Sequence, residues 1–245
     1  MKRSIPFLML AGALAGSPVA AAPDRPVPMM KTLDPQRLEL ARQLIVFEGE
    51  HCAYCAKFKA EVLEHWQSPV PVARTLSTVP PSGWKLAQPM FATPTIVLFE
   101  QGKEVSRYTG YNGEKERFWQ WLGYHLLTPA QQKIAFEQGT ERAFTGSNLD
   151  EKRKGTFVDP ITGAALFRSD TKFESGTGWP SFFNPLPGAI TQHEDNSLGM
   201  RRVEVRSASS GIHLGHVFDD GPPPTRKRYC INGNVLRFVP DPGQQ

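Results

Sequence analysis

Cysteine is scarce in this chain. Three cysteines stand among 245 residues, too few for a disulfide-stapled scaffold or for two four-cysteine zinc sites. Glycine and proline are frequent but follow no triplet repeat, which excludes a collagen-like helix. After the first 22 residues, no segment approaches the roughly 18 uninterrupted apolar residues that a membrane helix needs. Long runs of one charge are also missing, and the short basic runs 152–154 and 226–228 are typical of a solvated surface.

The chain does contain enough apolar material for packed cores. Its hydrophobic fraction is 40%, with 15 Phe and 5 Trp, and its net charge is only +4. This composition excludes wholesale disorder and does not favour a nucleic-acid partner. At roughly 100–200 residues per domain, the length predicts one large domain or two small ones.

The first 22 residues have the pattern of a secretory leader. Lys2 and Arg3 precede the apolar run Phe7–Gly16, and Ala20–Ala22 offers a small-residue cleavage site. An uncleaved anchor is disfavoured because the apolar run is short and contains glycine. We expect residues 1–22 to be a signal peptide. The mature protein is then expected to be exported and soluble, and a bacterial periplasm is the compartment that fits best.

Helical and strand patterns alternate through residues 23–125. The following segments are expected in chain order: a helix at Pro35–Gln43, a strand at Leu44–Phe47, a helix from the Cys52–Cys55 motif to about Trp66, a strand within Val70–Ser77, strands at Thr95–Glu100 and Val105–Tyr108, and a helix at Glu114–Leu127. This order predicts an α/β domain.

The pattern changes at Tyr124–Thr128. One more helix is expected at Pro129–Gln138, with Thr128 as its N-cap. Beyond it, turn signals recur and short strands are expected at Val203–Arg206, Leu214–Phe218 and Val235–Val239. The second half is therefore predicted to be mainly β, and the chain to divide into domains at 23–125 and 126–245.

Cys52 and Cys55 form a CxxC motif between a strand and a helix. Backbone N–H groups at a helix start stabilise a thiolate at the first cysteine, and the second lies within disulfide reach. The pair can therefore cycle between dithiol and disulfide. Half a zinc site and a static disulfide are the alternatives, but no paired ligands stand nearby.

The segment Phe47–Cys55, together with Thr93-Pro94-Thr95, resembles the active-site segment and the cis-proline loop of the thioredoxin superfamily. The resemblance covers about Met30–Tyr124. It implies that Cys52 is the exposed nucleophile and Cys55 the resolving cysteine. It also implies that Pro94 lies against the disulfide.

Four further residues draw attention in the second half. Cys230 follows a basic run that would favour a thiolate, although a lone thiol is more often a buried structural residue. His213 and His216 are three apart, and on a regular strand they would face opposite sides, so joint metal binding is not implied. Trp179, in a glycine-rich turn, is by itself a candidate core residue.

Five separated segments of residues 128–240 resemble, in order, type B methionine sulfoxide reductases, which act on the R epimer. They are QGTERAFTG at 138–146, SGTGWPSF at 175–182, residues 199–205, HLGHVFDDG at 213–221 and RYCIN at 228–232. The resemblance implies a mainly β fold of that family. Gly233 departs from the serine that many relatives have.

The resemblance also implies residue roles. Cys230 would be the nucleophile, Trp179 the aromatic wall for the substrate methyl group, and His213 and His216 the imidazoles around the sulfoxide oxygen. A polar shell that orients these groups would be formed by Asp220, Arg228 and Asn232. A thiolate, a proton donor and an apolar pocket are what sulfoxide reduction requires.

Many relatives carry structural zinc on two CxxC pairs. Here the matching positions are Asp159, Thr162, Ser207 and Ser210, so no metal or cofactor is expected. Some relatives also have a resolving cysteine where this chain has Thr177. The second domain therefore has no thiol of its own with which to reduce a Cys230 sulfenic acid.

Together these resemblances predict an enzyme that reduces methionine-R-sulfoxide in oxidised proteins. Cys230 would become a sulfenic acid, and the Cys52–Cys55 pair would resolve it. Re-reduction of that pair in a periplasm implies a membrane thiol-electron transporter as partner. The alternative is a thiol–disulfide exchange protein whose second domain binds methionine-rich peptides without catalysis.

Overall fold

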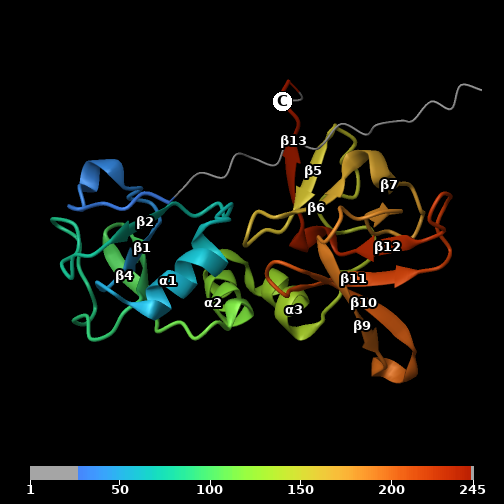
Figure 1. Cartoon of the computed structure of the whole chain (residues 1–245). Coiled ribbons are helices and arrows are strands. Elements are labelled where there is room, and N and C mark those ends of the chain that lie inside the picture. Colours follow the sequence, from blue (N-terminus) through green and yellow to red (C-terminus); the bar gives the residue numbers. More distant parts are fainter. Residues whose placement is uncertain (1–26, 244–245) are drawn as a thin grey trace, which may run out of the picture.

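The computed structural model describes residues 27–243, and the expected leader at 1–22 lies outside the described residues. Figure 1 shows two parts joined by the helices α2 and α3. Regular elements of the first part are η1 (Pro35–Arg37), β1 (Gln43–Phe47), α1 (Ala53–Phe58), η2 (Lys59–Leu63), β2 (Val72–Thr75), β3 (Thr95–Glu100), β4 (Lys103–Thr109) and α2 (Lys115–Leu126). No helix within 27–243 is long and apolar enough to cross a bilayer.

The first part is built on the sheet β2-β1-β3-β4. Its central strand β1 pairs in parallel with β2 and antiparallel with β3. All five β1 residues are buried, because alternate side chains point to opposite faces of the sheet and both faces are covered. Leu44 and Val46 join the core beneath the helices, whereas Ile45 and Phe47 pack with Trp84 on the other face. The predicted α/β domain is confirmed.

The second part is mainly β, as the sequence predicts. Its regular elements are α3 (Pro129–Glu137), β5 (Gly155–Val158), β6 (Ala165–Arg168), η3 (Ser169–Thr171), β7 (Lys172–Phe173), β8 (Ser181–Phe182), β9 (Ile190–Asp195), η4 (Ser197–Gly199), β10 (Arg202–Ser207), β11 (His213–Phe218), β12 (Arg228–Ile231), η5 (Gly233–Val235) and β13 (Arg237–Pro240). The described strands form two sheets, β7-β8-β12-β11-β10-β9 and β13-β5-β6. Phe167 stacks on Phe182 between them.

The expected helix at Pro35–Gln43 is wrong beyond its first turn. Asp34 caps the short 3-10 turn η1, which ends at Leu38 in an extended conformation, and bends lead from there to β1. Leu40 is largely exposed, so a longer helix here would lack an apolar face to bury. The expected strand at Val235–Val239 is also displaced, since Gly233–Val235 form the 3-10 turn η5 and the strand begins at Arg237.

The junction between the two parts is short and is held by packing and hydrogen bonds. Thr128 caps α3 with a full capping box, and its neighbour Leu127 is buried. The side chain of Gln132 donates hydrogen bonds back to the carbonyls of Tyr124 and Leu127, across the end of α2. The chain therefore passes from α2 into α3 without a flexible linker.

Two glycines allow close packing across the junction. A Cβ at Gly123 of α2 would collide with Ile161 of the second part and with Phe136 of α3. A side chain at Gly163, whose φ is +79°, would collide with the carbonyl of Gln67, just beyond η2. One hydrophobic cluster contains side chains of both parts, so they form one packed body.

Candidate active site

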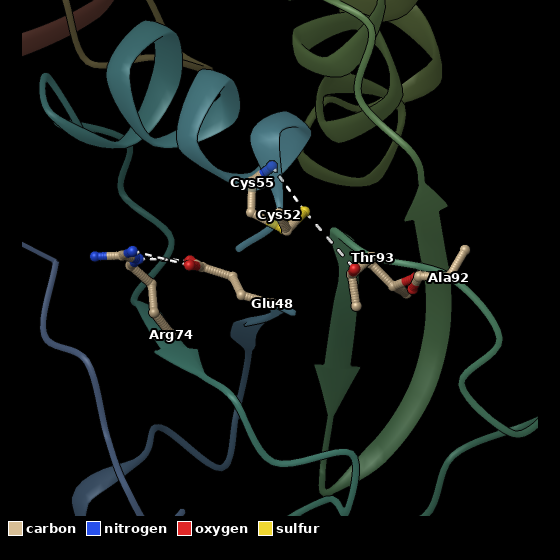
Figure 2. Close-up of a disulfide and its surroundings, with 7 residues drawn as sticks. Glu48, Cys52, Cys55, Arg74, Ala92 and Thr93 are labelled. Carbon is tan, nitrogen blue, oxygen red and sulfur yellow. Dashed lines mark hydrogen bonds and ion pairs between the residues drawn. A yellow bond between two sulfur atoms is a disulfide. The ribbon is translucent and has the colours of Figure 1, made fainter. Parts of the chain in front are cut away.

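The Cys52–Cys55 motif lies at the start of α1, where the sequence predicts a reactive cysteine. The two sulfurs form a disulfide, and Cys52 caps the helix by accepting the N–H of Cys55 at 3.1 Å (Figure 2). Cys55 is only 3% exposed, whereas Cys52 is half-buried. The structure thus makes Cys52 the more accessible sulfur of the pair.

The loop before β3 lies against this disulfide. The Thr93–Pro94 peptide is cis, and the Thr93 hydroxyl lies 3.7 Å from the sulfur of Cys52. Gly49 makes room for the loop, because a Cβ there would lie 2.8 Å from that hydroxyl. Beside this site, Tyr54 lines a cavity of about 400 Å³ with residues 108–112, 114 and 117.

Cys230 lies on β12 in the middle of the larger sheet. Its neighbours across the strands are His216 on β11 and Ser181 on β8. Burial raises the pKa of the Cys230 thiol, although the charge of Arg228 and a hydrogen bond with Thr177 act to lower it. The site is therefore a half-buried thiol beside one cation.

Of the basic run before Cys230, Arg228 lowers the pKa of the thiol as expected, but burial raises that pKa by more. The ammonium of Lys227 is exposed and pairs with Asp219. The guanidinium of Arg228 forms two hydrogen bonds to Asp220, at 2.8 and 2.9 Å, so its charge is shared with a carboxylate. Burial of Cys230 outweighs the attraction that remains.

His213 and His216 lie close together, although an undisturbed strand would point them to opposite sides. Their ring centroids are 5.4 Å apart. The cause is an irregularity between β10 and β11, where the pairing shifts after Val205. Gly215 permits it, because a Cβ there would collide with the carbonyl of Cys230. The expectation of opposite faces is therefore wrong.

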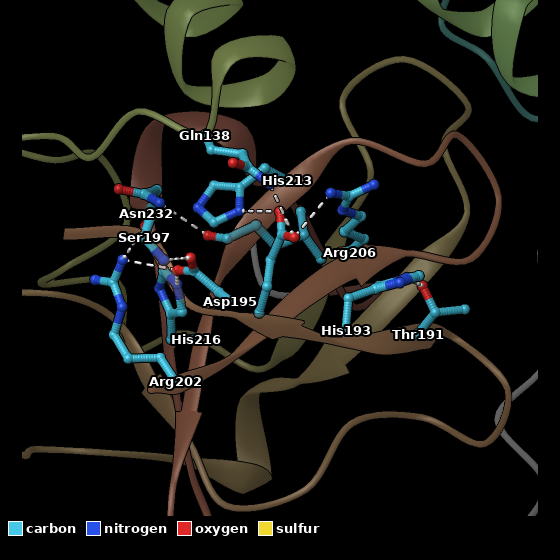
Figure 3. A network of polar contacts seen from close by, with 12 residues as sticks. Gln138, Thr191, His193, Asp195, Ser197, Arg202, Arg206, His213, His216 and Asn232 are labelled. Atoms are coloured by element: carbon cyan, nitrogen blue, oxygen red, sulfur yellow. Dashed lines mark hydrogen bonds and ion pairs between the residues drawn. The ribbon is translucent and has the colours of Figure 1, made fainter. Parts of the chain in front are cut away.

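Each imidazole is held by a carboxylate from a neighbouring strand (Figure 3). His213 Nδ1 lies 2.7 Å from Glu204 on β10, and His216 Nε2 lies 2.7 Å from Asp195 on β9. Burial lowers the pKa of His213 and outweighs the attraction of Glu204. The Nε2 atom of His213 is buried without a hydrogen-bond partner.

The two carboxylates are ionised at neutral pH. Burial tends to raise the pKa of Glu204, but Arg206 and His213 outweigh it and hold that pKa below its ordinary value. Hydrogen bonds from Ser197 and His216 hold the pKa of Asp195 far below the usual range. Both carboxylates therefore act as hydrogen-bond acceptors for the rings.

Glu141 connects the remaining predicted site residues. Its carbonyl accepts the indole N–H of Trp179 at 3.1 Å, and its own N–H donates to the side chain of Asn232 at 3.0 Å. Its carboxylate accepts the N–H groups of Gly233 and Asn234. Trp179 lines a cavity of about 150 Å³ together with Phe144, Ser175, Gly176 and Gly178.

Comparison with known proteins matches both parts of the chain. A SelR domain model matches residues 127–240, and a thioredoxin-like domain model matches residues 31–126. The peptide methionine sulfoxide reductase MsrB of Agrobacterium fabrum is 54% identical over 115 residues, which cover 46% of this chain and 85% of the relative. The chain belongs to the MsrB family.

Further likenesses fit the two parts separately. The MsrB of Leptospira interrogans is 52% identical over 113 residues, covering 46% of this chain and 86% of the relative. A crystal structure of the periplasmic thioredoxin SoxS from Paracoccus pantotrophus, in its reduced form, is 35% identical. It covers 34% of this chain and 93% of that chain, with a TM-score of 0.32. The matches to the two domain models make the N-terminal part a thioredoxin-like domain and the C-terminal part an MsrB domain.

The four positions that match zinc ligands of other MsrB domains form a hydrogen-bonded cluster. Asp159 is fully buried and accepts the N–H groups of Ile161 and Thr162 at 2.8 and 3.0 Å, and the hydroxyl of Ser210. Ser209 bridges the hydroxyls of Thr162 and Ser207. Within residues 27–243, no group of three or more His, Cys, Asp or Glu is arranged to hold a metal ion.

Three residues of the MsrB site were missed in the sequence: Glu141, Asp195 and Glu204. Glu204 could have been found from the sequence, because it stands between Val203 and Val205 in a short strand. A charged side chain on the face of a sheet needs a partner there. Asp195 and Glu141 gave none, since their roles depend on contacts across 21 and 38 or more residues.

Proposed function

We propose that this chain reduces methionine-R-sulfoxide residues in oxidised proteins through Cys230. The observation that carries the proposal is the group formed by Cys230, His213 and His216, with Trp179 held to the same site through Glu141 and Asn232. The MsrB relatives, named as peptide methionine sulfoxide reductases, support it.

The proposed reaction begins with the thiolate of Cys230 attacking the sulfoxide. The substrate oxygen must gain a proton as the S–O bond to methionine breaks, and the products are methionine and a Cys230 sulfenic acid. Arg228 stabilises the thiolate, because its guanidinium lies beside Cys230 and opposes the effect of burial. Trp179 offers an aromatic surface for the S-methyl group.

The two imidazoles have different roles in this proposal. Burial keeps His213 neutral, with Nδ1–H donating to Glu204, so its free Nε2 accepts a hydrogen bond. His216 lies directly across the strands from Cys230, and Asp195 fixes its ring through Nε2. We therefore assign protonation of the sulfoxide oxygen to His216.

The thioredoxin-like domain supplies the thiols that the MsrB domain lacks. Thr177 occupies the position of a resolving cysteine in some relatives, and Cys230 is the free cysteine of the described residues. The Cys52–Cys55 pair, with its accessible Cys52, fits the reduction of a sulfenic acid to a thiol.

Stereospecific turnover tests the function. The full chain is incubated with dithiothreitol and either R- or S-methionine sulfoxide, and released methionine is measured. We expect release from the R epimer alone, and none with Cys230→Ser. Release from neither epimer would favour the thiol–disulfide exchange protein with a non-catalytic second domain, and equal release from both would contradict the Trp179 pocket.

We also propose that the chain acts after export, with a membrane thiol-electron transporter re-reducing Cys52–Cys55. The leader pattern of residues 1–22 supports export, and an exported disulfide needs electrons from across the membrane. N-terminal sequencing of the protein from a bacterial periplasm is expected to begin near Pro23. An intact Met1, or a fully cytoplasmic protein, would contradict the proposal.

A further inference from the structure

Cys52 and Cys230 lie in different domains of the chain, at the start of α1 and on β12. Cys52 caps the first turn of α1, and the helical segment α1–η2 then runs from Ala53 to Leu63. At 1.5 Å per residue this segment spans about 16 Å. Its far end leads to Gln67, which contacts Gly163 of the MsrB domain. The CxxC motif thus lies at the end of the helix that points away from the MsrB domain.

The surroundings of each cysteine agree with this separation. The cavity beside Tyr54 is lined by residues of the thioredoxin-like domain alone. In Figure 1, α1 and β12 lie on opposite sides of the helices α2 and α3. Cys230, on β12, is therefore separated from Cys52 by the packed junction between the domains.

The junction leaves little freedom for one domain to swing round to the other. Leu127 is buried, Thr128 closes the capping box of α3, and Ile161 packs onto Gly123. Rotation about residues 127–128 would expose this apolar contact and break the hydrogen bonds of Gln132. An intrachain meeting of the two cysteines requires the junction to open.

Both cysteines are flanked by exposed aromatic side chains. Near Cys52, Tyr54 is 61% exposed and Phe91, just before the Thr93–Pro94 loop, is 73% exposed. On the MsrB domain, Phe144 is 68% exposed beside the Trp179 cavity, and Phe218 lies on the same strand as His216. Exposed aromatic residues at two complementary sites are typical of surfaces that meet a protein.

We infer that Cys52 of one chain resolves the sulfenic acid on Cys230 of a second copy of this chain. The inference rests on the proposed function. The surface that docks at the MsrB site is then the CxxC face of another molecule of this chain. Each chain then serves as reductant for its neighbour, and the rigid junction does not have to open.

The electron transfer balances in two steps. The Cys52 thiolate attacks the Cys230 sulfenic sulfur, forming the intermolecular Cys52–Cys230 disulfide and releasing the oxygen as water with one added proton. The Cys55 thiolate then attacks Cys52, which leaves the Cys52–Cys55 disulfide in one chain and a Cys230 thiol in the other. An external dithiol returns the oxidised pair to its reduced form.

Counting methionine in the absence of reductant tests the transfer. One variant, Cys230→Ser, keeps only the CxxC pair, and a second, Cys52→Ser with Cys55→Ser, keeps only Cys230. Both are reduced, freed of reductant, mixed in equal amounts and given R-methionine sulfoxide. Transfer between chains predicts two methionines per Cys230, because the nucleophile is regenerated once. The matched control, with a chain lacking all three cysteines as partner, predicts one.

The wild-type chain gives the second arm. Its second methionine should form at a rate per chain that falls tenfold when the protein is diluted tenfold. In the Cys55→Ser variant, the trapped disulfide should join two chains, seen at twice the chain mass on a non-reducing gel. One methionine from the mixture, with two from the wild type at a concentration-independent rate, would overturn the inference. No methionine from the Cys230-only variant would instead overturn the proposed function.

Discussion

The carboxylate of Glu204 lies 2.7 Å from Nδ1 of His213, and this contact decides which nitrogen of the ring carries the proton. Because the carboxylate is an acceptor, Nδ1 carries the proton and Nε2 presents a lone pair. Both residues are 2% exposed, so no water competes for the contact. Glu204 thus fixes the orientation and the tautomer of the His213 ring, and in the proposed reaction it is a positioning residue.

Glu204→Gln should lower kcat about tenfold to a hundredfold and change KM little, as expected for losing about 1.5–3 kcal/mol of a charged hydrogen bond. An amide cannot accept from His213, Arg206 and Gln138 together, because one of its two ends is a donor. Steady-state kinetics measure the effect. Glu194→Gln, an exposed carboxylate paired loosely with Arg201, is the matched control. Equal kcat in both variants would contradict the role of Glu204.

Asp195→Asn should lower kcat about tenfold and change KM little. The ionised carboxylate lies 2.7 Å from Nε2 of His216, and a neutral amide in its place makes a hydrogen bond to the ring that is weaker by about 1.5 kcal/mol. Steady-state kinetics with R-methionine sulfoxide measure the effect. The control is Asp219→Asn, which removes an exposed carboxylate that pairs with Lys227. A kcat for Asp195→Asn no lower than that of the control would show that Asp195 does not position His216 for the reaction.

The sequence predicts the helices and central strands better than it predicts the site. Amphipathic or continuous apolar runs give β1, β3 and α2 nearly to the residue, because burial decides both pattern and structure. Strands such as β7 and β8 contain two residues each, too few for any periodicity. They form because their neighbours offer hydrogen bonds, which the sequence alone does not reveal.

The two histidines illustrate the same limit. A regular strand predicts opposite faces for His213 and His216, but the shift in pairing beside Gly215 brings the rings together. The glycine was visible in the sequence, whereas the partner carbonyl of Cys230 was not. The family resemblance could suggest roles for the two histidines. The carboxylates that orient their rings could be found only once the register of the sheet was known.

Asp159→Ala should destabilise the MsrB domain. The fully buried carboxylate accepts two backbone N–H groups and the Ser210 hydroxyl, and alanine leaves all three without an acceptor. We expect a loss of about 2–4 kcal/mol in the free energy of unfolding. Thermal melting should show a Tm lower by several degrees, whereas Asp170→Ala, an exposed carboxylate in η3, should leave Tm nearly unchanged. Equal melting of the two variants would show that the cluster does not replace a stabilising metal site.

Arg228→Ala should raise the pKa of Cys230 further. In the native site, burial already raises that pKa, and the guanidinium of Arg228 is the nearby positive charge that limits the rise. Without it, less of the thiol is ionised at any pH between neutrality and the new pKa, so attack on the sulfoxide slows in proportion. The rate of Cys230 alkylation by iodoacetamide, followed against pH in a Cys52→Ser, Cys55→Ser background, reports the thiolate directly. Its inflection should move to higher pH in Arg228→Ala.

Lys227→Ala is the matched control, because this neighbouring cation is exposed and pairs with Asp219. The same inflection in Arg228→Ala and in the parent would mean that the cation orients substrate instead of stabilising the thiolate.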